Sequence, residues 1–196
     1  ITAFLVPTDA FEVETVWDTL GARSVKSPKV TLSGVRVPDA HRVGPVGEGY
    51  AQRGRVPNGV NVPARAVGIA RAALDATLDH AREREQFGRR IDEFQGVRWR
   101  VAKMAERVDT ARLLTLRAAA RADGGHDIGR ELSMAKVHAT EAAVDNAQDA
   151  MDVHGGIGYT TERPVERYLR DARLLTIAGG PNDIHRNKLA GRVIDG

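Results

Sequence analysis

The sequence has no cysteine among its 196 residues. That absence excludes a disulfide framework, a thiolate metal site and a cysteine nucleophile, while it permits a reducing compartment. Long apolar runs are also missing, and none approaches the roughly 18 residues that a transmembrane helix needs. The N-terminus lacks the charged and then apolar layout of a signal peptide. We therefore expect a cytoplasmic protein with no metal site and no membrane partner.

Neither sign of charge dominates the chain. The 29 Lys and Arg residues stand against 26 Asp and Glu residues, which gives a formal net charge of +3. Both signs interleave along the chain instead of gathering in a tail or a stripe, so nucleic-acid binding receives little support. With 42% hydrophobic and 28% charged residues, the composition is typical of a globular protein with one good-sized core or two small ones.

The first part of the chain, to about residue 46, is rich in β-branched residues and interrupted by Pro and Gly. Three runs, at residues 1–6, 11–16 and 30–37, predict antiparallel strands, with a bulge or bend at Ser33 and Gly34. The sequence opens on Ile1, within a strand-like run and without an initiator Met. We therefore expect that an upstream part is missing and that these strands are the remnant of a larger β-domain.

From about residue 60 the hydrophobic period becomes helical. Two apolar stripes with helical spacing, followed by a third helix after Gly124 and Gly125, predict three long amphipathic helices. Pro164 and Pro181 can each open a shorter helix, and these helices or a second subunit would close the bundle. We predict a mainly α protein, with an up-down four-helix bundle over residues 49–196 preceded by a partial antiparallel β-domain over residues 1–48.

Four stretches, in order, resemble the acyl-CoA dehydrogenase family and together cover nearly the whole chain. Any one of them is weak evidence because short glycine motifs recur by chance, but their order is specific. They are Leu20–Ser24 with Val35–Pro38 and Gly47–Tyr50, Arg84–Gly88 with Phe94–Gln95, His154–Tyr159 with Pro164–Arg167 and Arg170–Arg173, and Ile177–Pro181. The resemblance implies the end of the family's middle β-domain followed by its C-terminal helical bundle.

The resemblance also implies FAD as cofactor, with Arg84, Phe87, Gln95 and Gly156 reaching the FAD of a neighbouring subunit. Arg84 lies at the predicted end of the first long helix, where a guanidinium group can hold a pyrophosphate through two hydrogen bonds. Taken without the rest of the motif, Arg84 could equally cap a helix and Phe87 could pack in a loop. The remaining motifs favour the cofactor interpretation.

Three further positions match cofactor contacts of the family, and two of them, Asp152 and Pro181, carry other residues. Asp152 stands where a Gln usually contacts the nucleotide part of FAD, so a negative charge would face the pyrophosphate. Pro181 and Asp183 stand where the family has a Thr and an acidic or amide residue, at the start of the last helix. A helix N-terminus after glycines is a natural anion site. We expect FAD to bind here through fewer hydrogen bonds.

The catalytic base of the family has no evident counterpart. Removal of the α-proton of a thioester needs a carboxylate within hydrogen-bond reach, while the flavin accepts a hydride from the β-carbon. The two positions that carry this Glu in the family match Gly179 and Asn58, and neither residue can act as a base. Asp183 or a carboxylate upstream of this sequence could serve instead. A relocated base, an inactive subunit of a mixed oligomer and a different flavin reaction are the three interpretations left open.

The function that the resemblance implies is α,β-dehydrogenation of an acyl-CoA by an FAD-dependent acyl-CoA dehydrogenase or a close homologue. The resemblance also implies an electron acceptor as a partner and a homo-oligomer, either a dimer or a tetramer. One alternative is a non-catalytic subunit that supports the flavin site of a partner, and a weaker one is a helical interaction module whose motifs are accidental. We expect the 196 residues alone to bind FAD weakly or not at all.

Overall fold

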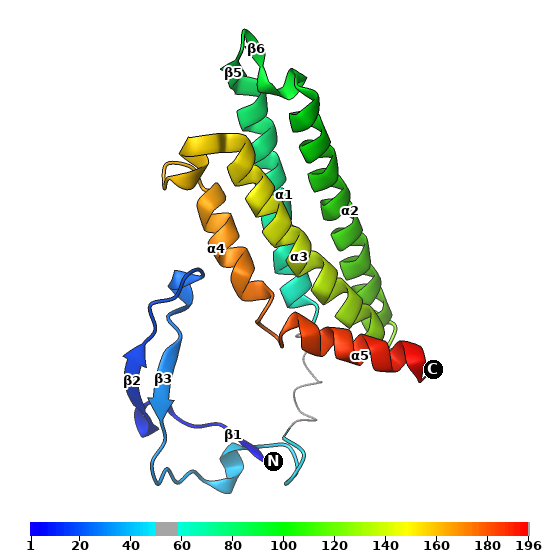
Figure 1. Cartoon of the computed structure of the whole chain (residues 1–196). Helices are drawn as coiled ribbons and strands as arrows, with labels where there is room; N and C mark the ends of the chain where they lie inside the picture. Colours follow the sequence, from blue (N-terminus) through cyan, green and yellow to red (C-terminus); the bar gives the residue numbers. More distant parts are fainter. Residues whose placement is uncertain (50–58, 196) are drawn as a thin grey trace. The chain divides into compact units, whose positions relative to one another are not determined.

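A computed structural model describes residues 1–49 and 59–195, and the chain forms two compact units, residues 1–58 and 59–196 (Figure 1). The domain boundary expected after residue 48 stays a prediction. Within the described residues, no helix is both long enough and apolar enough to cross a membrane. Each unit is considered by itself below.

The first unit contains two separate two-stranded antiparallel sheets. Strand β1 (Ala3–Phe4) pairs with β4 (Arg42–Val43), and β2 (Glu12–Val16) pairs with β3 (Pro28–Thr31). Strand β4, the partner of β1, lies in a segment where the sequence analysis predicted no strand.

The predicted third strand is too long, because β3 ends at Thr31. A bend does lie at Gly34, as predicted, and this residue takes a positive φ of 61° that an extended strand does not use. A register shift lies in β2, between Val13 and Thr15. Every residue of β2 and β3 is exposed, so β-branched content alone did not mark buried strands.

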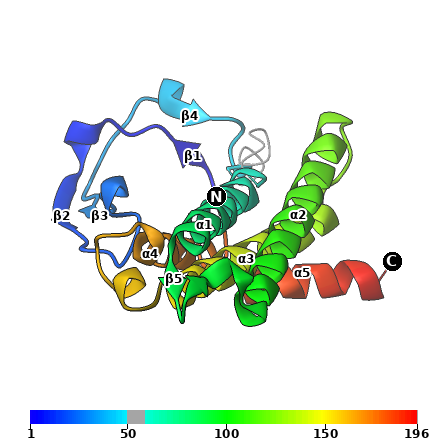
Figure 2. The ribbon, with the colours of Figure 1, turned by 90° about the horizontal axis from the view of Figure 1, so that it is seen from above.

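The second unit confirms the predicted up-down helical bundle. It consists of α1 (Asn61–Glu83), α2 (Gln95–Asp123), α3 (Gly129–His154), α4 (Val165–Leu175) and α5 (Asn182–Ile194). Helix α3 contacts the other four, and α4 closes the bundle against α1 and α3 (Figures 1 and 2). Helix α5 crosses α3 at the end of the bundle away from the hairpin of β5 (Glu85–Gln86) and β6 (Arg89–Arg90).

Small side chains fill most of the bundle core. The facing sides of α1 and α3 bury a row of alanines on each helix, and their short side chains allow the two backbones to approach closely. Larger core residues come from the flanking helices, including Met104 and Val108 of α2 and Val165 of α4. The core therefore joins α1 and α3 into a tight pair on which α2 and α4 pack.

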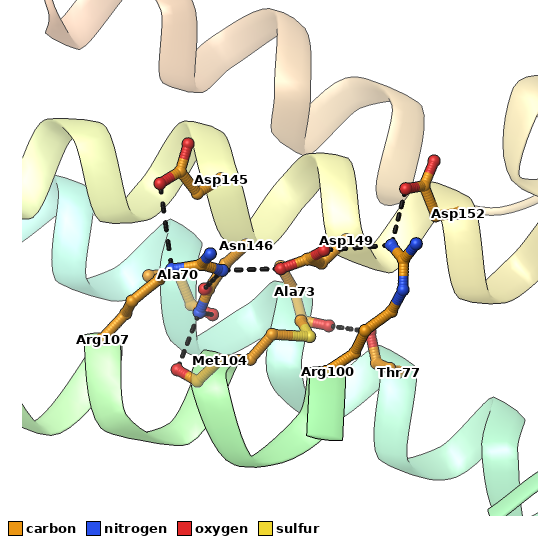
Figure 3. A network of polar contacts seen from close by, with 10 residues as sticks. All are labelled: Ala70, Ala73, Thr77, Arg100, Met104, Arg107, Asp145, Asn146, Asp149 and Asp152. Atoms are coloured by element: carbon orange, nitrogen blue, oxygen red, sulfur yellow. Dashed lines mark hydrogen bonds and ion pairs between the residues drawn. The ribbon is translucent and has the colours of Figure 1, made fainter. Parts of the chain in front are cut away.

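A polar network crosses this core and joins three helices (Figure 3). The fully buried Asn146 of α3 donates to the carbonyl oxygens of Ala70 in α1, at 3.2 Å, and Met104 in α2, at 3.0 Å. Arg107 donates to Asn146 Oδ1 at 3.2 Å and to Asp149 at 2.6 Å. Because hydrogen bonds have narrow geometry, the network sets the register of the three helices more strictly than alanine contacts do.

Candidate functional site

The hairpin between α1 and α2 presents an aromatic side chain at its tip. The two residues that join β5 to β6, Phe87 and Gly88, have φ values of 53° and 79°. Positive φ at both positions is the requirement of a tight type I′ hairpin turn. A Phe in this conformation is strained, and its side chain is 93% exposed. Local strain combined with exposure of a large apolar ring is typical of a residue that contacts a ligand or a partner.

Arg84 follows α1, where the sequence placed it, and its own N–H bonds to the carbonyl oxygen of His80 at 2.9 Å. The Arg84 side chain lines a cavity of about 340 Å³ together with Gly156, which belongs to the 3-10 turn after α3 (Gly155–Tyr159). The full set of lining residues is His80, Glu83, Arg84, His154, Gly156, Ile157 and Arg163. The structure thus brings together two of the predicted cofactor residues, which are 72 positions apart in the sequence, in a pocket with two guanidinium groups and one carboxylate.

The lining of the Arg84 cavity includes two histidines that the sequence analysis did not assign to the site. The rings of His80 and His154 stack with centroids 4.2 Å apart and an interplanar angle of 15°. Burial lowers the pKa of both side chains, and the positive charge of Arg163 lowers both further. The pattern that could have revealed the pair is its position: one His lies four residues before Arg84 and the other directly before the glycine turn.

A neighbouring hollow of about 420 Å³ contains Phe87 and Asp152, again as a pair of predicted cofactor residues. Asp152 forms an ion pair of 2.6 Å with Arg100 of α2, which also bonds to Asp149 at 3.1 Å. The Arg100 guanidinium group therefore compensates the negative charge that the sequence analysis expected to face a pyrophosphate. Phe87 meets Phe94 edge to face, with ring centroids 6.3 Å apart.

The other predicted cofactor residues lie elsewhere on the bundle. Gln95, the first residue of α2, is exposed and lines a third hollow of about 590 Å³ with Trp99. Pro181 and Asp183 line a hollow of about 350 Å³ at the start of α5, where Asp183 forms an ion pair of 2.9 Å with Arg186. Figure 1 places the start of α5 and the hairpin at opposite ends of the bundle.

The separation of these two groups can be estimated along α3. The residues of α3 beside α5 and beside the hairpin are Lys136 and His154, and at 1.5 Å per residue the distance between them is about 27 Å. Each end of the bundle therefore offers only part of the contacts that an extended dinucleotide would make.

Lys136 lies beside the predicted cofactor position Pro181, and the sequence analysis did not single it out. Its side chain is 1% exposed, and Nζ donates to the carbonyl oxygens of Thr176 and Gly180 and to Oδ1 of Asn182, at 3.1, 2.7 and 2.6 Å. Burial lowers the pKa of Lys136, although Glu141 opposes the shift. Lys136 thus holds the segment between α4 and α5, and a Lys on the otherwise small apolar face of α3 was the available signal.

The segment held by Lys136 includes Gly179, the position where the family carries its base. Gly179 and Gly180 have φ values of 71° and 106°, and the ring nitrogen Nε2 of His185 donates to the carbonyl oxygen of Gly179 at 3.1 Å. A Cβ atom added at Gly179 would meet only Val62 Cγ2, at 3.4 Å. The site has room for a side chain, but its backbone favours glycine. Asn58, the second base position, lies outside the described residues.

Three histidines in this unit predict a stability that depends on pH. Burial is the main cause that lowers the pKa of His80, His154 and His185. The unfolded chain therefore binds more protons than the folded one below the ordinary His pKa of about 6.5. We expect full stability above that pH and a melting temperature that falls by a few degrees as the pH drops toward about 5.5. Thermal unfolding followed by circular dichroism measures the melting temperature at each pH. A melting temperature that stays constant or increases as the pH drops would contradict the prediction.

The comparisons with known proteins agree on one family. A family model described as "Acyl-CoA dehydrogenase, C-terminal domain" matches residues 50–194. The probable acyl-CoA dehydrogenase YngJ of Bacillus subtilis (strain 168) is 38% identical over 198 residues, which cover 99% of this chain and 52% of that protein. The chain spans about half the length of the curated relatives it matches.

Solved structures show the same likeness. Butyryl-CoA dehydrogenase from Megasphaera elsdenii matches with a TM-score of 0.94 at 28% identity, over 98% of this chain and 51% of that one. The FAD complex of PigA matches with a TM-score of 0.91 at 28% identity, over 100% of this chain and 52% of that one.

Proposed function

The chain belongs to the acyl-CoA dehydrogenase family, and from this membership we propose that the protein is an FAD-dependent dehydrogenase that oxidises the α,β carbon–carbon bond of an acyl-CoA thioester. The observation that carries the proposal is the cavity that joins Arg84 and Gly156 beside the exposed Phe87. A cationic pocket next to an exposed aromatic ring suits a ligand that combines a pyrophosphate with flat rings. The cytoplasmic location stays a prediction.

The residues of this chain fit FAD at the hairpin end of the bundle. Arg84 and Arg163 supply guanidinium groups for the pyrophosphate, and Phe87 supplies an exposed ring. A Cβ atom added at Gly156 would meet nothing within 4 Å, so the glycine leaves open space in front of the backbone. When FAD is bound, its flavin would supply the hydride acceptor for the reaction. At the far end, the Lys136 ammonium group would keep the segment with Gly179 and Pro181 in place beside a second cofactor contact.

The distribution of the candidate residues favours a homo-oligomer, a dimer or a tetramer. Arg84, Phe87 and Gly156 lie at one end of the bundle, and Pro181 and Asp183 lie at the other, about 27 Å away along α3. If the first group contacts the FAD of a neighbouring subunit and the second contacts the FAD of its own subunit, two copies complete each other's sites. Gln95 and Asp152 would then belong to the surface around the shared site.

Catalysis also needs a base and an electron acceptor. In the described residues of the bundle, Gly179 cannot remove a proton, and Arg186 holds Asp183 in an ion pair. We therefore propose that the base is a carboxylate outside the described bundle. The two electrons and the proton gained by the flavin must leave again, so the proposed function includes an external electron acceptor.

The experiment supplies the full-length protein with FAD, a panel of short, long and branched acyl-CoAs and an artificial electron acceptor. We expect purification with a flavin absorption band and loss of that band when a suitable acyl-CoA is added under anaerobic conditions. Matched amounts of the free fatty acids serve as the control because they lack the thioester that acidifies the α-proton. Bound flavin that no acyl-CoA reduces would contradict catalysis, and absence of bound flavin would contradict the cofactor as well.

A Gly179→Glu variant sharpens this test. The added side chain has space at its Cβ, although a positive φ costs a residue other than glycine about 1–2 kcal/mol. If the wild-type protein binds flavin but fails to react, and the variant gains flavin reduction by an acyl-CoA, the protein is a non-catalytic subunit that lacks only its base. If the wild type reacts and the variant does not improve it, a base outside the described bundle is in place.

A further inference from the structure

The stacked rings of His80 and His154 are a feature of the Arg84 cavity that a simple anion site does not require. His80 lies in the last part of α1, and His154 is the last residue of α3. Their ring centroids are 4.2 Å apart, and both residues line the cavity beside Arg84 and Gly156. The pair therefore contributes two titratable groups to the walls of the proposed pyrophosphate site.

The hydrogen bond of His154 leaves its ring able to take up a proton. His154 Nδ1 lies 2.7 Å from the carbonyl oxygen of Ala150. Because a carbonyl oxygen only accepts, Nδ1 carries the proton, and Nε2 of the same ring is unprotonated in the neutral form. Protonation of that ring is thus compatible with the hydrogen bond that orients it.

The charges that face the pair come from two segments. Glu83 is the last residue of α1, Arg84 follows it, and Arg163 precedes α4. Burial and the two guanidinium groups lower the pKa of His80, while Glu83 raises it; burial and Arg163 lower the pKa of His154, while its bond to Ala150 raises it. A lowered pKa keeps the pair mainly neutral near pH 7, and a negative charge placed in the cavity would offset the positive charge of Arg163, which lowers both pKa values in addition to burial.

We propose that His80 and His154 are a proton-linked part of the anion site, so that an oligophosphate group binds together with the uptake of one proton by the pair. The proposal rests on the proposed function, which assigns the pyrophosphate of FAD to this cavity. The two binding events are linked: if a bound anion raises the proton affinity of the histidine pair, then a protonated pair binds the anion more tightly by the same factor. Two imidazolium rings at this separation would repel each other, which limits the uptake to one proton.

The direction of the effect follows from the charges. The pyrophosphate diester of FAD does not titrate near neutral pH, so a change in affinity must come from the protein. Uptake of one full proton gives at most a tenfold change in affinity per pH unit. We expect FAD to bind the full-length protein about 3- to 10-fold more tightly at about pH 5.5 than at about pH 7.5.

The test titrates FAD into flavin-free full-length protein at both pH values by isothermal calorimetry, in two buffers with different enthalpies of ionisation. The difference between the buffers gives the number of protons taken up on binding. His80→Phe keeps an aromatic ring in the stack but removes one titratable group. His126→Phe is the matched control because His126 is exposed, in the turn between α2 and α3.

We expect proton uptake on binding in the wild type and in the control, and a His80→Phe variant with reduced uptake and a weaker pH dependence. If His80→Phe retains the wild-type behaviour, His154→Phe must remove it, and persistence in both variants overturns the proposal. Equal affinity at the two pH values in the wild type overturns it without any variant. Absence of FAD binding at every pH would instead refute the proposed function.

Discussion

Replacement of Lys136 by Met in the full-length protein is expected to lower the free energy of unfolding by about 3 kcal/mol, because one buried and two partly buried acceptors lose a charged donor. The acceptors are the carbonyl oxygens of Thr176 and Gly180 and the amide oxygen of Asn182. Met fills a similar volume and removes the cost of burying a charge, but it cannot satisfy these oxygens. Denaturant unfolding followed by circular dichroism measures the change.

Lys188→Met provides the matched control, since Lys188 is exposed on α5. The control should leave the unfolding midpoint almost unchanged. Limited proteolysis should cut the Lys136→Met variant between α4 and α5 faster than the control, because Lys136 ties that segment to α3. Equal midpoints for the two variants would mean that Lys136 contributes no net stability.

Replacement of Gly158 by Ala should destabilise the bundle by about 2–3 kcal/mol through overpacking. The added Cβ atom would lie 2.7 Å from the carbonyl oxygen of Met151 and 2.8 Å from Cβ of His154, and a backbone atom cannot move aside cheaply. The displacement would also shift the turn that carries Gly156. We therefore expect both the melting temperature and the affinity for FAD to fall.

Gly156→Ala separates the two effects. A Cβ atom at this position meets nothing within 4 Å, and the φ angle of Gly156 is not positive, so an alanine can adopt it. Stability should therefore be unchanged. If FAD approaches the backbone here, its affinity should fall about tenfold, which corresponds to about 1.4 kcal/mol. A Gly156→Ala variant with wild-type affinity would remove Gly156 from the proposed cofactor contacts.

The helical part of the fold was predictable because its signal repeats along the chain. Apolar spacing of three and four residues predicted α1, α2 and α3, and Pro164 and Pro181 correctly marked the starts of α4 and α5. The strands were less predictable because a strand is defined by its partner. The run at residues 30–37 is rich in β-branched residues, yet only its first two residues, Val30 and Thr31, find a partner in β2.

The site was predictable only in part. Motif order selected Arg84 and Gly156, and the structure places both in one cavity. It did not select His80 or Lys136, because the roles of these residues depend on His154 and on the segment after α4, which are distant in sequence. The role of a single His on a helix, or of a Lys among alanines, can be assigned only when the residues that face it are known.

By itself, then, the sequence determined the bundle and the family, since hydrophobic periodicity and the order of motifs are properties of the linear chain. Only the tertiary structure decided which residues meet. It joined Arg84 and Gly156 with the stacked histidines and placed Pro181 and Asp183 at the far end of the bundle. It also showed that Gly179, one of the two positions predicted for the base, lies in a glycine turn held by a buried Lys136. Burial, stacking and hydrogen bonding depend on distances between remote segments, and those distances exist only once the helices have packed.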